Sequence, residues 1–174
     1  MKTAFVNRAV VLTALAATAL MAGCPPPPPA PFETTGTYAG EWWGTTEDQA
    51  QEIVACPLTV ELTQDVTLSY PGDHVVTGLV TVDYSCLELP EWAGEMPPAT
   101  EEVAGILGDD GTLTLATGGC GTALCVSLVL TGQAADVYGD GFMDTYAGDW
   151  RYRILLAGVP PFGVDGGFDL AIQP

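Results

Sequence analysis

The clearest chemical groups in the sequence are cysteine thiols. Besides Cys24, near the N-terminus, the chain contains Cys56, Cys86, Cys120 and Cys125. Four thiols could form two disulfides, in three possible pairings, or hold a zinc ion together. Their spacings contain no C-x-x-C pair and fit a zinc site poorly. The sequence therefore predicts two disulfides.

The second candidate for chemistry is the acidic segment 136–144, Asp-Val-Tyr-Gly-Asp-Gly-Phe-Met-Asp. Asp136, Asp140 and Asp144, with a glycine at relative position 6, overlap part of an EF-hand calcium loop. Positions 3 and 12, which supply ligands in that loop, are tyrosine and alanine here. A connection between two strands would contain the same residues. We therefore predict no bound metal, and these three aspartates are the best calcium candidate.

Catalytic groups are scarce. His74 is the only histidine; it follows Pro71-Gly72-Asp73, which predicts an exposed turn, and no nucleophile elbow is present. With 22 acidic residues, some carboxylates will be close together in any fold, so a close pair does not indicate a glycosidase. Phosphate loops, dinucleotide fingerprints and haem motifs are absent from the sequence. The prediction is a protein that is not an enzyme and has no cofactor.

The N-terminal segment, residues 1–23, has the pattern of a signal peptide. Two basic residues precede an apolar run, 9–22, which is shorter than the about 20 residues that a membrane span needs. The run leads into Leu20-Met21-Ala22-Gly23-Cys24, which resembles the lipobox of bacterial lipoproteins. The resemblance implies cleavage before Cys24 and acylation of that residue, which would anchor the chain to a membrane. Pro25 stands where an inner-membrane retention signal would have Asp, so we expect the outer membrane if the host has two.

Cleavage would leave a strongly acidic chain. It would remove two of the four basic residues and none of the 22 acidic ones, which gives a net charge of −20. This charge argues against nucleic acid as a partner and would repel anionic lipid surfaces. Residues 24–35 are then the lipidated cysteine and a proline-rich tether, whose Pro-rich run 25–31 would extend about 20 Å as polyproline II. Export also favours disulfides over free thiols.

Residues 36–174 are predicted to be one all-β domain, because short alternating runs are separated by Gly, Pro and Asp. The eight predicted strand cores are 36–44, 56–66, 74–86, 101–108, 112–118, 124–132, 145–156 and 165–173. Segment 47–54 could form one or two helical turns, and 88–100 is predicted to be a loop. Eight strands in simple order favour an antiparallel up-and-down barrel, with a β-sandwich as the alternative.

Two predicted hairpins suggest how the cysteines pair. In the first, a register that aligns the apolar faces places Leu58 opposite Tyr84 and Cys56 opposite Cys86. In the second, the fifth and sixth strands place Leu115 opposite Leu130. The same register pairs Cys120 with Cys125, on the outer face. We predict the disulfides Cys56–Cys86 and Cys120–Cys125.

The first strand contains Gly40-Glu41-Trp42. This element resembles the start of the first strand in calycins, the superfamily of lipocalins, fatty-acid-binding proteins and avidins. The resemblance implies a barrel in which the tryptophan closes one end, often packed on an arginine of the last strand. Here Arg151 and Arg153 lie one strand earlier, and we expect them to pair with outward acids such as Asp149.

Several aromatic residues share one face of their strands and would lie inside such a barrel. They would line an apolar pocket if the barrel is open, or form the core if it is filled. These possible ligand-binding residues are Tyr38, Trp42, Trp150, Tyr152 and Phe168. The predicted function is that of a membrane-anchored, extracytoplasmic lipoprotein that binds a small apolar ligand. The alternative is an envelope lipoprotein with a filled barrel and no ligand, acting as a structural or protein-interaction domain.

Overall fold

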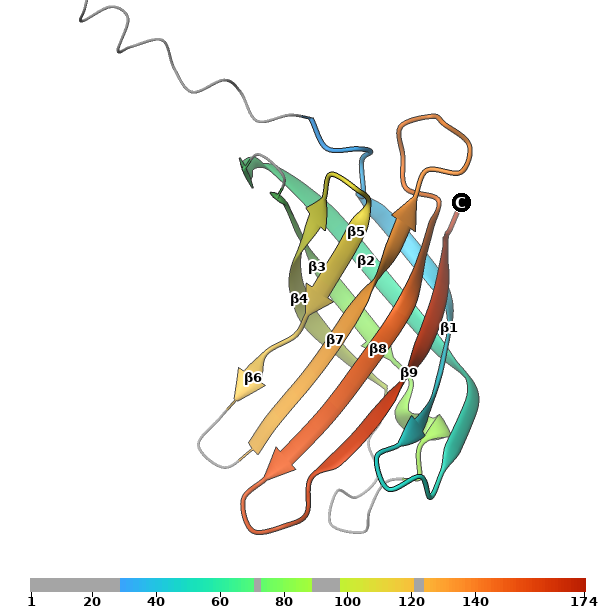
Figure 1. Cartoon of the computed structure of the whole chain (residues 1–174), viewed down its shortest axis with the longest axis vertical. Helices are drawn as coiled ribbons and strands as arrows, with labels where there is room; N and C mark the ends of the chain where they lie inside the picture. The colour runs from blue at the N-terminus through green and yellow to red at the C-terminus, as the bar shows by residue number, and fades with distance from the viewer. Residues whose placement is uncertain (1–28, 71–72, 89–97, 121–123) are drawn as a thin grey trace, which may run out of the picture.

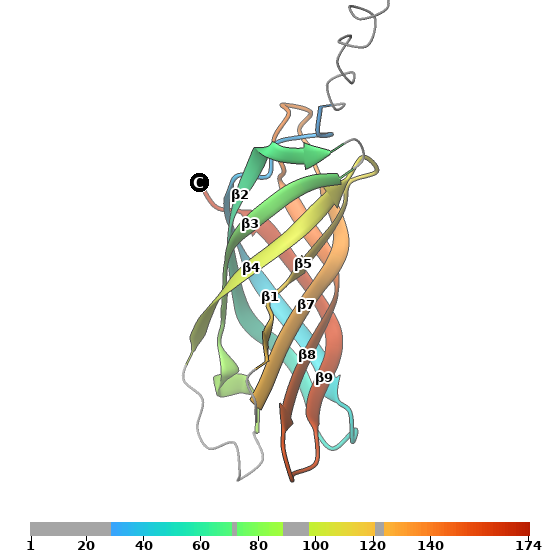
Figure 2. The same cartoon turned by 90° about the vertical axis from the view of Figure 1, so that its left-hand side faces the viewer.

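The computed structural model describes residues 29–70, 73–88, 98–120 and 124–174. The described parts form a β-barrel with one short 3-10 helix, η1 (Figure 1, Figure 2). The elements are β1 Gly36–Thr46, β2 Glu52–Tyr70, β3 Asp73–Val82, η1 Tyr84–Cys86, β4 Ala99–Gly108, β5 Thr112–Ala116, β6 Gly119–Cys120, β7 Leu124–Ala135, β8 Thr145–Leu156 and β9 Phe162–Ile172. None of the described segments is a helix long and apolar enough to cross a membrane.

Every strand pairs antiparallel with its neighbours, and the sheet closes on itself. The order is β5-β4-β3-β2-β1-β9-β8-β7-β6, and an additional pairing of β5 with β7 completes the ring. Strand β6 has only two residues and pairs with β7 just beyond the part of β7 that pairs with β5. β5 and β6 therefore occupy one strand position, and the barrel has eight. This confirms the predicted up-and-down barrel and excludes the β-sandwich. All eight predicted strand cores correspond to strands.

The helical turns suggested for 47–54 are wrong. β2 already begins at Glu52, and the residues before it form a tight turn in which Gln49 has a φ of 57°. Asp48 holds this turn: its carboxylate accepts hydrogen bonds from the Thr46 hydroxyl at 2.6 Å and from the Ala50 amide at 3.1 Å. Such side-chain bonds to nearby backbone favour a turn over a helix. Of the predicted loop 88–100, residues 89–97 lie outside the described residues, and β4 begins at Ala99.

The predicted register of the β2–β3 hairpin is wrong by two residues, although its apolar faces are assigned correctly. Leu58 lies opposite Val82 instead of Tyr84. The register shifts between Asp65 and Tyr70, where β2 contains more residues than the facing part of β3. A slip of two residues keeps every side chain on its own face, so the hydrophobic pattern cannot detect it.

The predicted disulfide Cys56–Cys86 forms by a different route. β3 ends at Val82, before it reaches Cys86, and η1 then brings Cys86 back to Cys56 with a Cα–Cα distance of 6.1 Å. The second hairpin matches its prediction: Leu115 lies opposite Leu130, and Cys120 opposite Cys125. Cys125 is disulfide-bonded. The side chain of Cys120 lies outside the described residues, so its pairing stays a prediction.

Candidate functional site

The predicted ligand-binding aromatics all face the barrel interior. Tyr38, Trp42, Trp150, Tyr152 and Phe168 are each at most 2% exposed. The indole centroids of Trp42 and Trp150 are 4.0 Å apart, and Trp150 stacks on Tyr152 at 6.3 Å. These three residues therefore form one group, in which Trp42 packs on a second tryptophan and not on an arginine.

Two further tyrosines, which were not predicted as site residues, complete the aromatic interior. Tyr146 packs edge-on against Phe168 at 4.7 Å, and Tyr84 lies 5.1 Å from Tyr152. Tyr146 shares the inward face of β8 with Trp150 and Tyr152, so strand alternation could have identified it. Aromatic and aliphatic side chains thus pack against one another through the interior.

The phenol groups of the interior differ in their partners. The Tyr146 hydroxyl lies 3.0 Å from the carbonyl oxygens of both Leu113 and Leu130. Burial raises the pKa of Tyr146, so this phenol stays protonated. Among the described residues, neither the Trp42 indole nitrogen nor the Tyr152 hydroxyl has a partner in hydrogen-bonding geometry. Burial also raises the pKa of Tyr152, and the nearby Tyr84 hydroxyl opposes this shift.

A groove of about 800 Å³ lies on the outer wall, over β1, β9, β8 and β7. The strand registers explain its lining as two parallel rows of outward residues. One row is Trp43, Gly167, Asp149 and Thr131, and the other is Thr45, Asp165, Arg151 and Val129. Between the rows, Gly44 and Gly166 add no side chain, and Gly148 lies just beyond the first row, so the floor of the groove is largely backbone.

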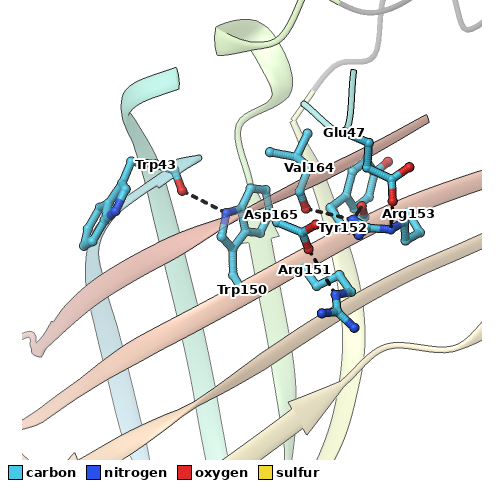
Figure 3. Close-up of polar contacts among 8 residues, drawn as sticks. All are labelled: Trp43, Glu47, Trp150, Arg151, Tyr152, Arg153, Val164 and Asp165. Carbon is cyan, nitrogen blue, oxygen red and sulfur yellow. Dashed lines mark hydrogen bonds and ion pairs between the residues drawn. The ribbon is translucent and has the colours of Figure 1, made fainter. Parts of the chain in front are cut away.

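Two glycines allow Trp43 to lie against the wall. A Cβ at Gly166 would be 1.8 Å from the Trp43 carbonyl oxygen, and a Cβ at Gly167 would be 2.8 Å from the indole ring. The Trp43 ring therefore covers Gly167 and remains 42% exposed on its other side. Its carbonyl oxygen accepts a hydrogen bond from the Trp150 indole nitrogen at 3.0 Å, which links the groove to the core (Figure 3).

The second row contains an ion-pair cluster. Arg151 donates from Nε to Asp165 at 3.0 Å, and Arg153 donates from Nη2 to the other Asp165 oxygen at 2.7 Å. Arg153 also contacts Glu47 at 2.9 Å (Figure 3). The two arginines therefore pair with outward acids, as expected, but the partners are Asp165 and Glu47 and not Asp149, because the β8–β9 register places Arg151 directly opposite Asp165. The sequence alone could not supply this register.

The other candidates from the sequence, Cys24, His74 and the potential metal ligands, do not belong to the groove or the interior group. Cys24 lies outside the described residues. His74 is only 2% exposed, so the predicted exposed turn histidine is wrong: β3 begins at Asp73 and turns His74 inward, where Nε2 is 3.1 Å from an Asp109 oxygen. In the described parts of the chain, no group of three or more potential metal ligands is arranged to hold an ion.

The three aspartates of the calcium candidate shape a loop. Asp136 accepts hydrogen bonds from the amides of Gly139, Asp140 and Gly141. Asp144 accepts from two other amides of the loop, and Asp140 from one. Since the carboxylates are directed at backbone N–H groups, the geometry gives the calcium candidate no support.

Comparison with known proteins identifies no relative: no family model, no curated protein and no solved structure matches the chain.

The ion-pair cluster predicts a specific response to acid. The hydrogen bond from Arg153 lowers the pKa of Asp165, with smaller contributions from Arg151. A carboxylate with a lowered pKa stabilises the fold fully above its unfolded value, near pH 4, and this contribution is lost as the pH falls through the folded pKa. We expect Asp165→Asn to lower the free energy of unfolding by no more than about 1 kcal/mol at neutral pH, because the carboxylate is half exposed.

Urea unfolding between pH 7 and pH 2 measures this effect. The difference between wild type and Asp165→Asn should shrink as the pH falls below about 4. Asp169→Asn is the control, because Asp169 is an exposed carboxylate on the same strand that makes no ion pair with the described residues. A difference that stays constant down to pH 2 would show that the ion pairs do not stabilise the fold.

Proposed function

We propose that the protein is a membrane-anchored lipoprotein of the cell envelope whose filled barrel acts through its outer surface. The proposal rests on how tightly the side chains of the barrel interior are packed. The largest side chains facing it pack directly on one another and are almost completely buried. The groove, in contrast, opens on the outer wall. A scaffold of this kind binds at its surface and not in its lumen.

The geometry of the N-terminal segment fits an anchor. Glu33 pairs with Phe142, and its backbone hydrogen bonds with Gly141 and Met143 at 2.8 Å hold the segment just before β1 against the β7–β8 loop. The chain therefore enters at that end of the barrel (Figure 1). Trp43 lies seven residues beyond Gly36, the first residue of β1, which is about 23 Å along the strand. An anchored barrel would hold the groove away from the membrane.

The chemistry of the chain agrees with an extracytoplasmic location. The disulfide Cys56–Cys86 belongs to an oxidising compartment. The net charge of −20 after cleavage would keep the domain soluble above an anionic membrane, with the proline-rich segment as spacer. The barrel and its simple strand order are also what the resemblance to calycins implies.

Fractionation of cells expressing the full chain tests the anchor. We expect the wild type to sediment with the outer membrane, to require detergent for release, and to carry acyl chains on Cys24 by mass spectrometry of its N-terminal peptide. Cys24→Ser should be exported but remain soluble. A wild type that is soluble without detergent, or a Cys24→Ser variant that stays with the membrane, would contradict the anchor. Recovery with the inner membrane would contradict the outer-membrane placement.

A second function, carriage of a small apolar ligand, is favoured by one observation. The Trp42 indole nitrogen is buried without a partner among the described residues, and the buried Tyr152 hydroxyl has only the nearby Tyr84 hydroxyl beside it. A buried polar group without a partner costs about 1–3 kcal/mol, and a polar atom on a ligand could accept a hydrogen bond from the Trp42 indole nitrogen. If the barrel carries such a ligand, the ligand should co-purify with the protein.

A further inference from the structure

We propose that the outer groove binds a neutral saccharide, with one sugar ring stacked on Trp43. This inference rests on the proposed function, since it names the ligand class of the outer surface. The groove is lined by one exposed aromatic ring, two carboxylates, one guanidinium and two threonine hydroxyls. Each of these groups has a role in holding a polyhydroxylated ring.

Trp43 supplies the stacking surface. One face of the indole lies over Gly167, so the ring is supported against the wall, and its other side is open to solvent. The face of an aromatic ring carries a negative potential that attracts weakly positive hydrogens. A sugar ring presents several C–H groups on one face and hydroxyls around its edge. It can therefore stack on Trp43 while its hydroxyls reach the polar groups beside the ring.

The polar groups lie where those hydroxyls would be. Asp149 and Thr131 continue the row of Trp43 across the wall, and Arg151 with Asp165 forms the adjacent row. Carboxylates accept hydrogen bonds from hydroxyls, and a guanidinium donates to their oxygens. Arg151 uses only Nε in its bond to Asp165, and its two terminal nitrogens donate to no described residue and point away from the ion pair (Figure 3).

Charge selects a neutral ligand over an ionic one. The groove holds one arginine against two aspartates, within a chain of net charge −18 before cleavage, so an anion is disfavoured. A cation would be attracted more strongly to other parts of the surface. This is because Arg151 and Arg153, the only basic residues beyond the predicted signal peptide, both lie at or beside the groove. A neutral polyol is neither repelled by the carboxylates of the groove nor drawn to more acidic parts of the surface.

The dimensions fit a short oligosaccharide. Four adjacent strands span about 14 Å at the usual spacing of about 4.8 Å, and the groove volume of about 800 Å³ falls in the range of small-molecule sites. The groove is shallow and floored by backbone, so we expect modest affinity.

A glycan array tests the proposal. It should carry neutral glucans, chitin fragments and mannans together with sialylated, uronic and sulfated glycans. The probe protein is the mature lipoprotein in a detergent without a sugar head group. We expect binding to one neutral class. Isothermal titration with the best neutral tetrasaccharide should show at least tenfold weaker binding for Trp43→Ala, weaker binding for Arg151→Ala, partial retention for Trp43→Phe, and no change for the control Asp169→Asn.

Several results would overturn the proposal. They are no binding to any neutral glycan, binding to acidic glycans alone, or neutral binding that Trp43→Ala leaves unchanged. Binding of a lysine-rich peptide, lost in Trp43→Ala, in the absence of glycan binding would assign the groove to a basic partner instead. Melting temperatures of the variants control for folding. None of these results would place a ligand inside the barrel, so failure of the saccharide proposal is distinguishable from failure of the proposed function.

Discussion

Replacing Trp42 with alanine should lower the free energy of unfolding by about 3–5 kcal/mol, the range for large aromatic truncations in packed cores. The side chain is fully buried, and its ring lies 4.0 Å from that of Trp150 between centroids. Truncation would remove these contacts and leave a cavity that the rigid barrel wall cannot close. Urea unfolding at neutral pH, followed by circular dichroism, measures the change.

The neighbouring Trp43 provides a matched control. It is the same residue type, one position along β1, but it lies on the outer wall. We expect Trp43→Ala to cost no more than about 1 kcal/mol, as for most surface substitutions. Equal small losses for the two variants would contradict a filled interior, because a side chain that lines an open pocket can be removed at little cost.

Removing the disulfide Cys56–Cys86 should have the second largest effect. The two cysteines are 30 residues apart in sequence, and in the chain-entropy description a loop of this length stabilises by about 3–4 kcal/mol. The double variant Cys56→Ala/Cys86→Ala should therefore unfold at a clearly lower urea concentration than the wild type. Its barrel should still form, because the strand pairings do not depend on the bridge.

Reductant gives an independent measurement on the wild type. Its effect on the double variant reports the remaining bridge at Cys125, which closes a much shorter loop if Cys120 is the partner and should contribute about 2 kcal/mol. A double variant as stable as the oxidised wild type would show that the disulfide Cys56–Cys86 does not stabilise the fold.

The sequence predicts the fold well because the barrel depends on local patterns. Alternation along each strand and Gly/Pro/Asp breaks between strands are visible in single segments. The β2–β3 hairpin shows what local patterns do not determine: with the extra residues in β2 before Tyr70, the observed register differs from the predicted one by two residues, and alternation cannot detect an even difference. The Cys56–Cys86 pairing survives because η1 restores the approach that the register alone would lose.

The three tryptophans at or beneath the groove show why the outer site was missed. Alternation along β1 and β8 places Trp42 and Trp150 on the inward face, so the sequence identifies them as interior residues. Trp43 lies on the outward face of β1, where alternation predicts only an exposed side chain. Its place beside Arg151 depends on the closure of the barrel, in which β9 lies between β1 and β8. The predicted barrel implies that the first and last strands pair, but no local pattern gives the register of that pairing.

His74 illustrates a different error. Its position after Pro71-Gly72-Asp73 indicates a turn, but the strand begins one residue before the histidine and directs it inward. In β3 the buried positions alternate through His74, Val76, Val80 and Val82, so a histidine inside the strand is buried, whereas the same histidine in a turn would be exposed. Boundaries are what sequence patterns define least well.

Native mass spectrometry of the mature lipoprotein, purified from envelopes in detergent, tests the filled barrel most directly. We predict a single species whose mass equals the chain from Cys24 with its acyl groups, less four hydrogens for two disulfides, and with no other molecule retained after the detergent is removed in the gas phase. A stoichiometric apolar molecule that stays bound, and is lost in Trp42→Ala but not in Trp43→Ala, would contradict the account and make the barrel a carrier.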